Sequence, residues 1–305
     1  MKKINIMGVD NGVGLVKDWN ILRELLSPYY DIFFIDMEIK NTRLRGADLN
    51  IFLEKVVRPY MRLAPVNVLI PNPEWYYWGE KQAQEFDYIF AKTKDTERIF
   101  TERKCRVVFT SFTSENHYNS KIKKERVFIH SPGKSETKGS DIIWRTWIKE
   151  PDLPKLIFCR INHFEKYTQK PKNVDKCFIK FQEDEFRILQ NSCYFHLCTS
   201  EYEGWGHYLH EAKSLGAIVF TANAPPMNTF ITKDMGFLID VQSREKRNSG
   251  ILCKISGSSL KHEIRKSIQL DDNRLKQLSD NTIQSFHDND RFFRWKFLET
   301  IKNII

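Results

Sequence analysis

The sequence lacks any segment long and apolar enough to cross a bilayer. A membrane-spanning helix needs about 20 consecutive apolar residues, and no such run occurs in the 305 residues. The first nine residues start with a charged end, as a signal peptide does, but their short apolar stretch runs into Asp10. A signal-peptide core has ~7–15 apolar residues. We therefore interpret Lys3–Val9 as a β-strand and expect a cytoplasmic protein.

Cysteine, glycine and proline are also sparse. The six cysteines are scattered without a CxxC pair, so the sequence predicts neither a zinc ribbon nor a disulfide framework. Most lie in apolar runs, as small buried side chains in a reducing compartment do. Thirteen glycines and eleven prolines are too few for a fibrous or low-complexity chain. With 41% hydrophobic residues, the chain is expected to be globular and soluble.

Charge is biased towards lysine and arginine. The chain has 48 basic and 39 acidic residues, so its formal net charge is 48 − 39 = +9. A lysine-rich surface explains this excess, and so does an anionic small-molecule substrate, a nucleic acid or an acidic membrane face. Charge alone does not choose among these partners.

Strands and helices alternate along the N-terminal half. Short apolar stretches predict strands. Apolar residues that recur about every 3.6 positions predict helices at Lys17–Leu26 and Leu49–Tyr60. The predicted strands are Lys3–Val9, Tyr30–Asp36, Val66–Pro71, Tyr88–Lys92 and Arg106–Thr110. This alternation favours a parallel sheet wound by right-handed crossovers.

The same pattern restarts after the basic stretch Asn119–Arg126. A helix is predicted at Trp205–Leu215, and further helices at Leu260–Ile268, Asp271–Asp288 and Asp290–Ile305. The predicted strands are Val127–Ser131, Leu156–Arg160, Asp175–Lys180, Tyr194–Thr199, Ala217–Thr221 and Gly236–Val241. We therefore expect an α/β protein with two doubly wound, Rossmann-like domains that face a cleft. Their predicted ranges are 1–124 and 125–288, followed by a terminal helix at 289–305 that crosses back to the first domain.

Loops that follow the strands are the places to search for chemistry, because parallel sheets bind ligands beyond the carboxyl ends of their strands. The first such loop is Asp10–Gly14. Gly12 and Gly14 allow backbone N–H groups to approach an anion at a helix N-terminus. The loop is not a GxGxxG motif, and a plain tight turn explains it equally well.

A second loop, Ser131–Gly139, carries two lysines four residues apart. Lys134 and Lys138 lie between a predicted strand and the predicted helix Ser140–Ile148. Both ammonium groups and the positive end of that helix suit a diphosphate. The alternative is a lysine-rich turn exposed to solvent.

The third loop, Thr199–Glu211, places two carboxylates around a glycine-rich turn. Glu203 precedes Gly204, Trp205 and Gly206, and Glu211 follows eight residues after Glu203. Glycine destabilises the start of a helix unless the backbone conformation requires it. The two glycines therefore suggest that the backbone of this turn approaches a ligand closely. Carboxylates accept hydrogen bonds from sugar hydroxyls. Two surface carboxylates without a role are the alternative.

These residues also carry a family resemblance. The segment from Thr199 to Asn228 resembles the E-x7-E signature of retaining GT-B glycosyltransferases of family 4, which includes glycogen, sucrose and lipid mannosyl synthases. The matching residues are Ser200, Glu203, Gly204, Trp205, Gly206, Glu211, Ala212, Gly216, Pro225 and Pro226. The loop Ser131–Gly139 is similar to the basic loop that opens the C-terminal domain of that family.

The resemblance implies a role for each matched residue. It implies that Lys134 and Lys138, with Gly133, hold the diphosphate of a nucleotide sugar, and that Glu203 contacts the transferred sugar. It places Gly204, Trp205, Gly206 and His207 under the sugar and β-phosphate, and Glu211 on the ribose hydroxyls. Arg160 ends the next predicted strand and is a further candidate for donor binding.

Three departures from the family pattern stand out. Lys134 replaces a common arginine, which keeps the charge and loses bidentate geometry, and Trp205 replaces a common phenylalanine. Asn228 stands where a glutamate is frequent. No histidine of the N-terminal half aligns with a catalytic one. His117 follows a predicted strand and is a candidate, although a surface histidine is the simpler interpretation.

The implied activity is transfer of a sugar from a nucleoside-diphosphate sugar to an acceptor hydroxyl, with retention and without a metal or other cofactor. The acceptor is a glycan, a lipid or a protein-linked glycan. The resemblance implies that the domain 1–124 is the acceptor side and that the domain 125–288 binds the nucleotide sugar. Alternatives are a glycosyltransferase that modifies DNA bases, a sugar-nucleotide epimerase of the same fold, and a non-catalytic binding protein. Aromatic and basic residues of the last helix, including Phe292, Phe293, Trp295 and Phe297, suit either packing or peripheral contact with a membrane.

Overall fold

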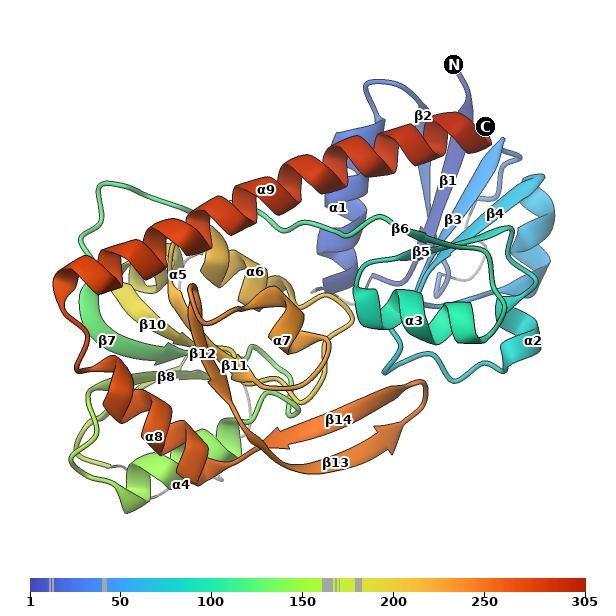
Figure 1. Ribbon diagram of the computed structural model, residues 1–305. Coiled ribbons are helices and arrows are strands. Elements are labelled where there is room, and N and C mark those ends of the chain that lie inside the picture. The colour runs from blue at the N-terminus through green and yellow to red at the C-terminus, as the bar shows by residue number, and fades with distance from the viewer. Residues whose placement is uncertain are drawn as a thin grey trace. The chain divides into compact units, whose positions relative to one another are not determined.

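The computed structural model describes residues 1–10, 12, 14–39, 43–160, 167, 169, 171–178 and 183–305. The chain divides into two compact units. The first unit comprises Met1–Ser114, Lys246–Gly250 and Asp288–Ile305, and the second comprises Glu115–Glu245 and Ile251–His287. Each unit contains a six-stranded sheet in which every strand pairs in parallel (Figure 1).

The sheet of the first unit has the strand order β2-β1-β3-β4-β5-β6. Its strands are β1 (Lys3–Gly8), β2 (Asp31–Asp36), β3 (Leu49–Leu53), β4 (Val66–Ile70), β5 (Tyr88–Ala91) and β6 (Val107–Phe109). The helical elements of this part are α1 (Gly14–Leu26), the 3-10 helix η1 (Arg58–Leu63), α2 (Glu80–Ala83) and α3 (Lys94–Glu102). Strand order reverses at β1, because β2 lies on one side of it and β3 on the other.

The helix predicted at Leu49–Tyr60 is wrong. Leu49–Leu53 forms β3, all five of its residues are buried, and the helical segment η1 starts only at Arg58. An inner strand of a parallel sheet is covered on both faces, so it has no alternation of apolar and polar residues to identify it.

Three buried asparagines align across this sheet. The amide of Asn5 on β1 donates to Asn50 Oδ1 on β3 at 3.1 Å, and the amide of Asn50 donates to Asn67 Oδ1 on β4 at 2.9 Å. These residues are also partners in the strand register. A shift of register would leave buried amides unpaired, so the asparagines favour one alignment of the three strands.

The sheet of the second unit has the order β12-β11-β10-β7-β8-β9. Its strands are β7 (Glu125–His130), β8 (Leu156–Arg160), β9 (Val174–Phe178), β10 (Cys193–Leu197), β11 (Ile218–Ala222) and β12 (Gly236–Ile239). The helices of this part are α4 (Ser140–Lys149), α5 (Glu183–Ser192), α6 (His207–Ser214), α7 (Met227–Phe230) and α8 (Gly257–Ser267). Phe128 on β7 stacks on Phe195 of β10 with ring centroids 4.5 Å apart, at the centre of the core.

A two-stranded hairpin, β13 (Val241–Arg247) and β14 (Gly250–Ile255), follows β12. The sequence did not predict this hairpin, because β13 consists mostly of polar and charged residues and has too few apolar residues to indicate a strand. The tip of the hairpin belongs to the first unit. There Ser249 N–H donates to Pro73 O at 3.1 Å, and the Asn248 amide donates to Glu74 O at 2.8 Å.

The last helix is continuous. The two helices predicted at Asp271–Asp288 and Asp290–Ile305 form one 33-residue helix, α9 (Asp272–Ile304). Its residues from Asp288 onwards group with the first unit. There Phe293 and Phe297 are fully buried, whereas Phe292 and Trp295 are 37% and 58% exposed. None of the helices in the described ranges has the length and apolar character needed to span a membrane.

The different burial of aromatic residues on α9 predicts a large difference in stability. Phe293 packs against Phe112 and Phe297, with ring centroids 4.8 and 5.4 Å away. We expect Phe293→Ala to lower the free energy of unfolding by about 3–5 kcal/mol, because it leaves a cavity. Trp295→Ala, on the exposed face, should change it by less than about 1 kcal/mol. Urea denaturation followed by circular dichroism measures both, and equal losses would contradict this assignment of the core.

Candidate functional site

The strand order of the second sheet points to one part of its edge. From β7 the chain continues to β8 and β9 on one side, and then returns to β10, β11 and β12 on the other. The order therefore reverses between β7 and β10. Ligands of open parallel sheets bind beyond the carboxyl ends of the strands at such a reversal. The segments that follow β7 and β10 are two of the three that the sequence singles out, Ser131–Gly139 and Thr199–Glu211.

Gly139 brings these two loops into contact. It has a left-handed backbone with φ of 71° and immediately precedes α4. A Cβ atom there would lie 2.7 Å from Thr199 Oγ1 and 2.8 Å from Thr199 O, distances that no side chain tolerates. Thr199 Oγ1 donates to Lys138 O at 2.8 Å, and Glu201 N–H donates to Thr137 O at 2.9 Å. The loops are thus joined through their backbones.

The joined loops pair Lys138 with Glu203. The ammonium of Lys138 donates to Glu203 Oε1, and the side chains are 15% and 10% exposed. The hydroxyl of Ser200 donates to the same carboxylate oxygen. Lys138 also lies over the ring of Tyr208, 4.6 Å from its centroid. The sequence predicted both residues as site residues, but not that they form an ion pair.

A stacked aromatic pair supports the turn before α6. Gly206, with φ of 86°, precedes the helix, which begins at His207 rather than at the predicted Trp205. Trp205 stacks on His210 with ring centroids 3.8 Å apart, and both side chains are buried. Burial lowers the pKa of His210 well below its ordinary value, and nearby Lys213 and His207 lower it further. A neutral His210 therefore packs under Trp205 and holds the glycine turn in place.

Charged neighbours alter the pKa of the buried Cys198 thiol. Burial raises the pKa of this thiol, Glu203 raises it further, Lys138 lowers it and Glu211 raises it. Lys138 and Glu203, which the sequence placed on separate loops, form an ion pair, and Glu211 lies on α6, directly after the Glu203 loop.

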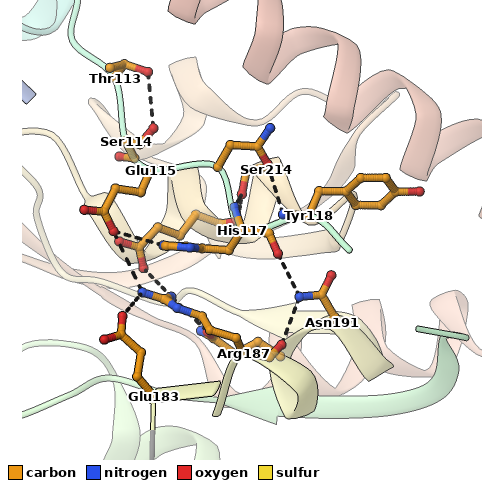
Figure 2. Close-up of polar contacts among 12 residues, drawn as sticks. Thr113, Ser114, Glu115, His117, Tyr118, Glu183, Arg187, Asn191 and Ser214 are labelled. Carbon is orange, nitrogen blue, oxygen red and sulfur yellow. Dashed lines mark hydrogen bonds and ion pairs between the residues drawn. The ribbon is translucent and has the colours of Figure 1, made fainter. Parts of the chain in front are cut away.

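Glu211 has a counterion that the sequence did not reveal. Nη1 of Arg187, on α5, lies 3.6 Å from Glu211 Oε2. Nη2 of the same guanidinium lies 3.3 Å from Glu183 and 4.0 Å from Glu115 (Figure 2). Glu211 is 4% exposed. A carboxylate buried to this degree needs a positive partner. No motif surrounds Arg187, so only the fold reveals its role.

His117 lies beside this cluster, within the second unit. Its Nε2 is 3.2 Å from Glu115 Oε2, its N–H donates to Ser214 Oγ, and its carbonyl accepts from Asn191 (Figure 2). The ligand atoms of Glu115, His117 and Glu211 lie within 4.8 Å of one another, a separation that a metal ion would fit. Arg187 already provides positive charge to both carboxylates, and a cation would have to compete with it.

The remaining predicted residues occupy different settings. Gly133 has a left-handed φ of 64°, and Lys134 beside it is exposed on the same loop. Asn228 on α7 donates from its amide to Asn223 Oδ1 at 3.3 Å. Gly12 and Gly14 belong to the first unit, where Gly12 precedes α1 and Gly14 is the first residue of that helix. Arg160 ends β8, and its side chain lies outside the described residues.

The sequence matches no family model and no curated protein. Among solved structures, sucrose-phosphate synthase from Thermosynechococcus elongatus is similar with a TM-score of 0.77 and 10% identity, over 100% of this chain and 99% of that one. Anabaena HepE in complex with UDP has a TM-score of 0.72 and 13% identity, over 99% of this chain and 100% of that one.

A third similar structure is the pneumococcal O-GlcNAc transferase GtfA in complex with UDP and GlcNAc. Its TM-score is 0.66 at 14% identity, over 86% of this chain. The match covers only 57% of the pneumococcal chain. These similarities, together with the two six-stranded parallel sheets, confirm the predicted GT-B class with two Rossmann-like units.

Two glycines of the basic loop provide a test of the loop contact. Gly133 and Gly139 both have left-handed backbones, but a Cβ atom at Gly133 would meet nothing within 4 Å. We expect Gly133→Ala to lower the free energy of unfolding by about 1–2 kcal/mol, the cost of the left-handed backbone alone. Gly139→Ala should lower it by a further ~1–3 kcal/mol because of overpacking against Thr199. Urea denaturation compares them, and equal losses would rule out the close contact.

Proposed function

We propose that the chain is a glycosyltransferase that moves a sugar from a nucleoside-diphosphate sugar to an acceptor hydroxyl. The observation that carries this proposal is the ion pair of Lys138 and Glu203 at the reversal of strand order in the second sheet, with the buried Glu211 on α6, the helix that follows the same loop. One positive and two negative side chains suit a ligand that combines phosphates with hydroxyl-bearing sugars. The GT-B class supports the proposal, and two of the similar structures are complexes with UDP.

The positive charge of the loop Ser131–Gly139 stabilises the diphosphate leaving group. Breaking the bond between the sugar and the diphosphate builds negative charge on the β-phosphate. Lys138 and Lys134, with the backbone N–H groups at the start of α4, stabilise that charge as it develops, which lowers the barrier. These groups supply the charge that a divalent cation supplies in other transferases, so we propose a reaction without a metal or other cofactor.

The two glutamates hold the two sugars of the donor. Glu203 accepts hydrogen bonds from the transferred sugar, and Glu211 accepts them from the ribose. Donor binding then exchanges the contact between Lys138 and Glu203 for contacts with phosphate and sugar. Gly204 and Gly206 allow the turn to pass close beneath the ligand, and Gly133, Trp205, His207 and Arg160 complete the proposed donor set.

The finer features of the reaction are also proposals. By resemblance to the E-x7-E family, we propose retention at the anomeric carbon and a glycan, a lipid or a protein-linked glycan as acceptor. Proton NMR of the product gives the anomeric configuration directly. A DNA acceptor predicts instead binding to duplex DNA that weakens steeply with salt, and a lipid acceptor at a membrane predicts association with vesicles.

A thermal-shift screen tests the donor. A ligand that binds only the folded state raises its melting temperature, so we expect UDP, GDP or ADP, or one of their sugars, to stabilise the protein. UDP is tested first because it occurs in two similar structures. A chain that none of these compounds stabilises, and that turns over none of their sugars, is not the proposed transferase.

Lys138→Ala tests the stabilisation of the leaving group. Removal of one preorganised donor costs ~2.7–4 kcal/mol of transition-state stabilisation, so turnover, measured well below the melting temperature, should fall at least about a hundredfold. The melting temperature itself falls, because Glu203 loses its counterion. Lys149→Ala, an exposed lysine at the end of α4, is the matched control and should leave turnover unchanged. Near-normal turnover by folded Lys138→Ala would refute the role.

Glu211→Ala tests the assignment to the ribose. Hydrogen bonds to a charged group contribute about 1.5–3 kcal/mol, so the free nucleotide should bind at least about tenfold more weakly, with a smaller loss in turnover at saturating donor. Glu183 faces the same guanidinium of Arg187 but is 77% exposed, so Glu183→Ala is the control. Isothermal titration measures both. An equal loss in the control would assign the effect to Arg187 rather than to the ribose contact.

A further inference from the structure

The sheet of the first unit has its own reversal of strand order, between β1 and β3. Four polar side chains gather at the carboxyl ends of its inner strands. Glu54 directly follows β3, Asn72 follows β4, Lys92 follows β5, and Asp18 lies on α1, the helix after β1. This is the position at which a parallel sheet binds a ligand.

Glu54 has an uncommon backbone conformation. Its φ is 62°, in the left-handed region, and its N–H donates to Ile70 O at 3.0 Å. For a residue with a side chain this conformation costs about 1–2 kcal/mol. Glycine would avoid that cost, so the glutamate side chain is retained at the expense of stability. Such strain is typical of functional positions.

The carboxylate of Glu54 is oriented by Asn72. The Asn72 amide donates to Glu54 Oε2 at 2.6 Å, which fixes the opposite atom of that amide, Oδ1, as an acceptor. Within the part of the chain that the structure describes, Asn72 Oδ1 is buried and accepts no hydrogen bond. A buried acceptor without a donor is unfavourable, and a ligand hydroxyl would satisfy it.

The neighbouring charges are already paired. Lys92 Nζ lies 2.9 Å from Asp18 Oδ2, and these side chains are 2% and 3% exposed. Burial raises the pKa of the Glu54 carboxyl, the Asn72 hydrogen bond and Lys92 lower it, and Asp18 raises it. The net shift raises the pKa of Glu54, because burial outweighs the Asn72 hydrogen bond and Lys92. Lys92 and Asp18 form an ion pair, so the group offers an anionic ligand no surplus positive charge, and the nearby ammonium of Lys92 disfavours a metal ion.

We propose that Glu54 and Asn72 bind the hydroxyl groups of a saccharide acceptor. Two oxygens from adjacent side chains accept hydrogen bonds from two hydroxyls, the one feature that every saccharide offers. This assignment rests on the proposed glycosyl transfer, which needs a second substrate in addition to the donor. Glu54 and Asn72 belong to the first unit, whereas Lys138, Glu203 and Glu211 of the proposed donor site belong to the second.

The loop that starts at Asn72 also offers aromatic surface. Trp75 and Tyr77 are 49% and 70% exposed, and Tyr77 stacks on Trp78. The hairpin tip holds this loop, since Ser249 Oγ donates to Tyr76 O at 2.8 Å and Arg247 stacks on Trp75 at 4.4 Å. The C–H faces of sugars pack well against the electron-rich faces of aromatic rings, so a saccharide is favoured over other polyhydroxyl compounds.

The test compares transfer to a saccharide with transfer to water. Wild-type protein is given the nucleotide sugar that stabilises it most, together with methyl α-glucoside, methyl β-galactoside and methyl N-acetyl-β-glucosaminide as acceptor probes. We expect Glu54→Gln and Asn72→Ala to lower the ratio of glycoside formed to free sugar released at least about tenfold, as loss of a hydrogen bond to a charged group implies. Nucleotide binding and donor hydrolysis should remain within about twofold of wild type.

The matched control is Glu102→Gln, which alters an exposed glutamate paired with Arg98 on α3. It should leave both rates unchanged. The proposal is overturned if Glu54→Gln leaves the ratio as it is, if hydrolysis falls by the same factor, or if wild type hydrolyses donor and glycosylates none of the probes. A wild-type chain that neither binds nor hydrolyses any donor would instead refute the proposed transferase activity, and this assignment with it.

Discussion

The close contact between Gly139 and Thr199 determines how the two loops of the proposed donor site are arranged. The two loops come from β7 and β10, which are neighbours in the sheet only because the strand order reverses between them. Without a Cβ atom at position 139 the backbones approach closely enough to join. As a result Lys138 and Glu203, 65 residues apart in the sequence, form an ion pair. One left-handed glycine therefore brings opposite charges to the edge where ligands bind.

The first sheet reaches a polar edge by a different route. At Glu54 a residue with a side chain adopts the conformation that glycine adopts at position 139. Glycine there would relieve strain, whereas the glutamate adds a carboxylate that Asn72 orients. The distinction is informative, because a left-handed glycine indicates a backbone requirement and a left-handed glutamate indicates a requirement for the side chain. The two sheets share a topology, and their edges differ in chemistry.

The sequence predicts the two-sheet architecture because alternating strands and helices leave few alternatives. It fails at Leu49–Leu53, where burial on both faces removes the alternation, and at the charged strand β13. In the site, Lys138, Glu203 and Glu211 could be predicted, because local motifs surround them. Arg187 and the pair of Glu54 and Asn72 could not, because each acquires its partner only through tertiary folding.

The two ion pairs of the second unit behave differently in the proposed reaction. Ribose hydroxyls donate hydrogen bonds to Glu211 but bring no charge, so they cannot replace Arg187 as the counterion of a buried carboxylate. Arg187 therefore stays beside Glu211 when the nucleotide binds, and the Glu211 oxygens accept hydrogen bonds from the ribose hydroxyls. The phosphates bring negative charge that competes with Glu203 for Lys138. Consequently the pair of Arg187 and Glu211 persists when the donor binds, whereas the pair of Lys138 and Glu203 is replaced by contacts with the donor.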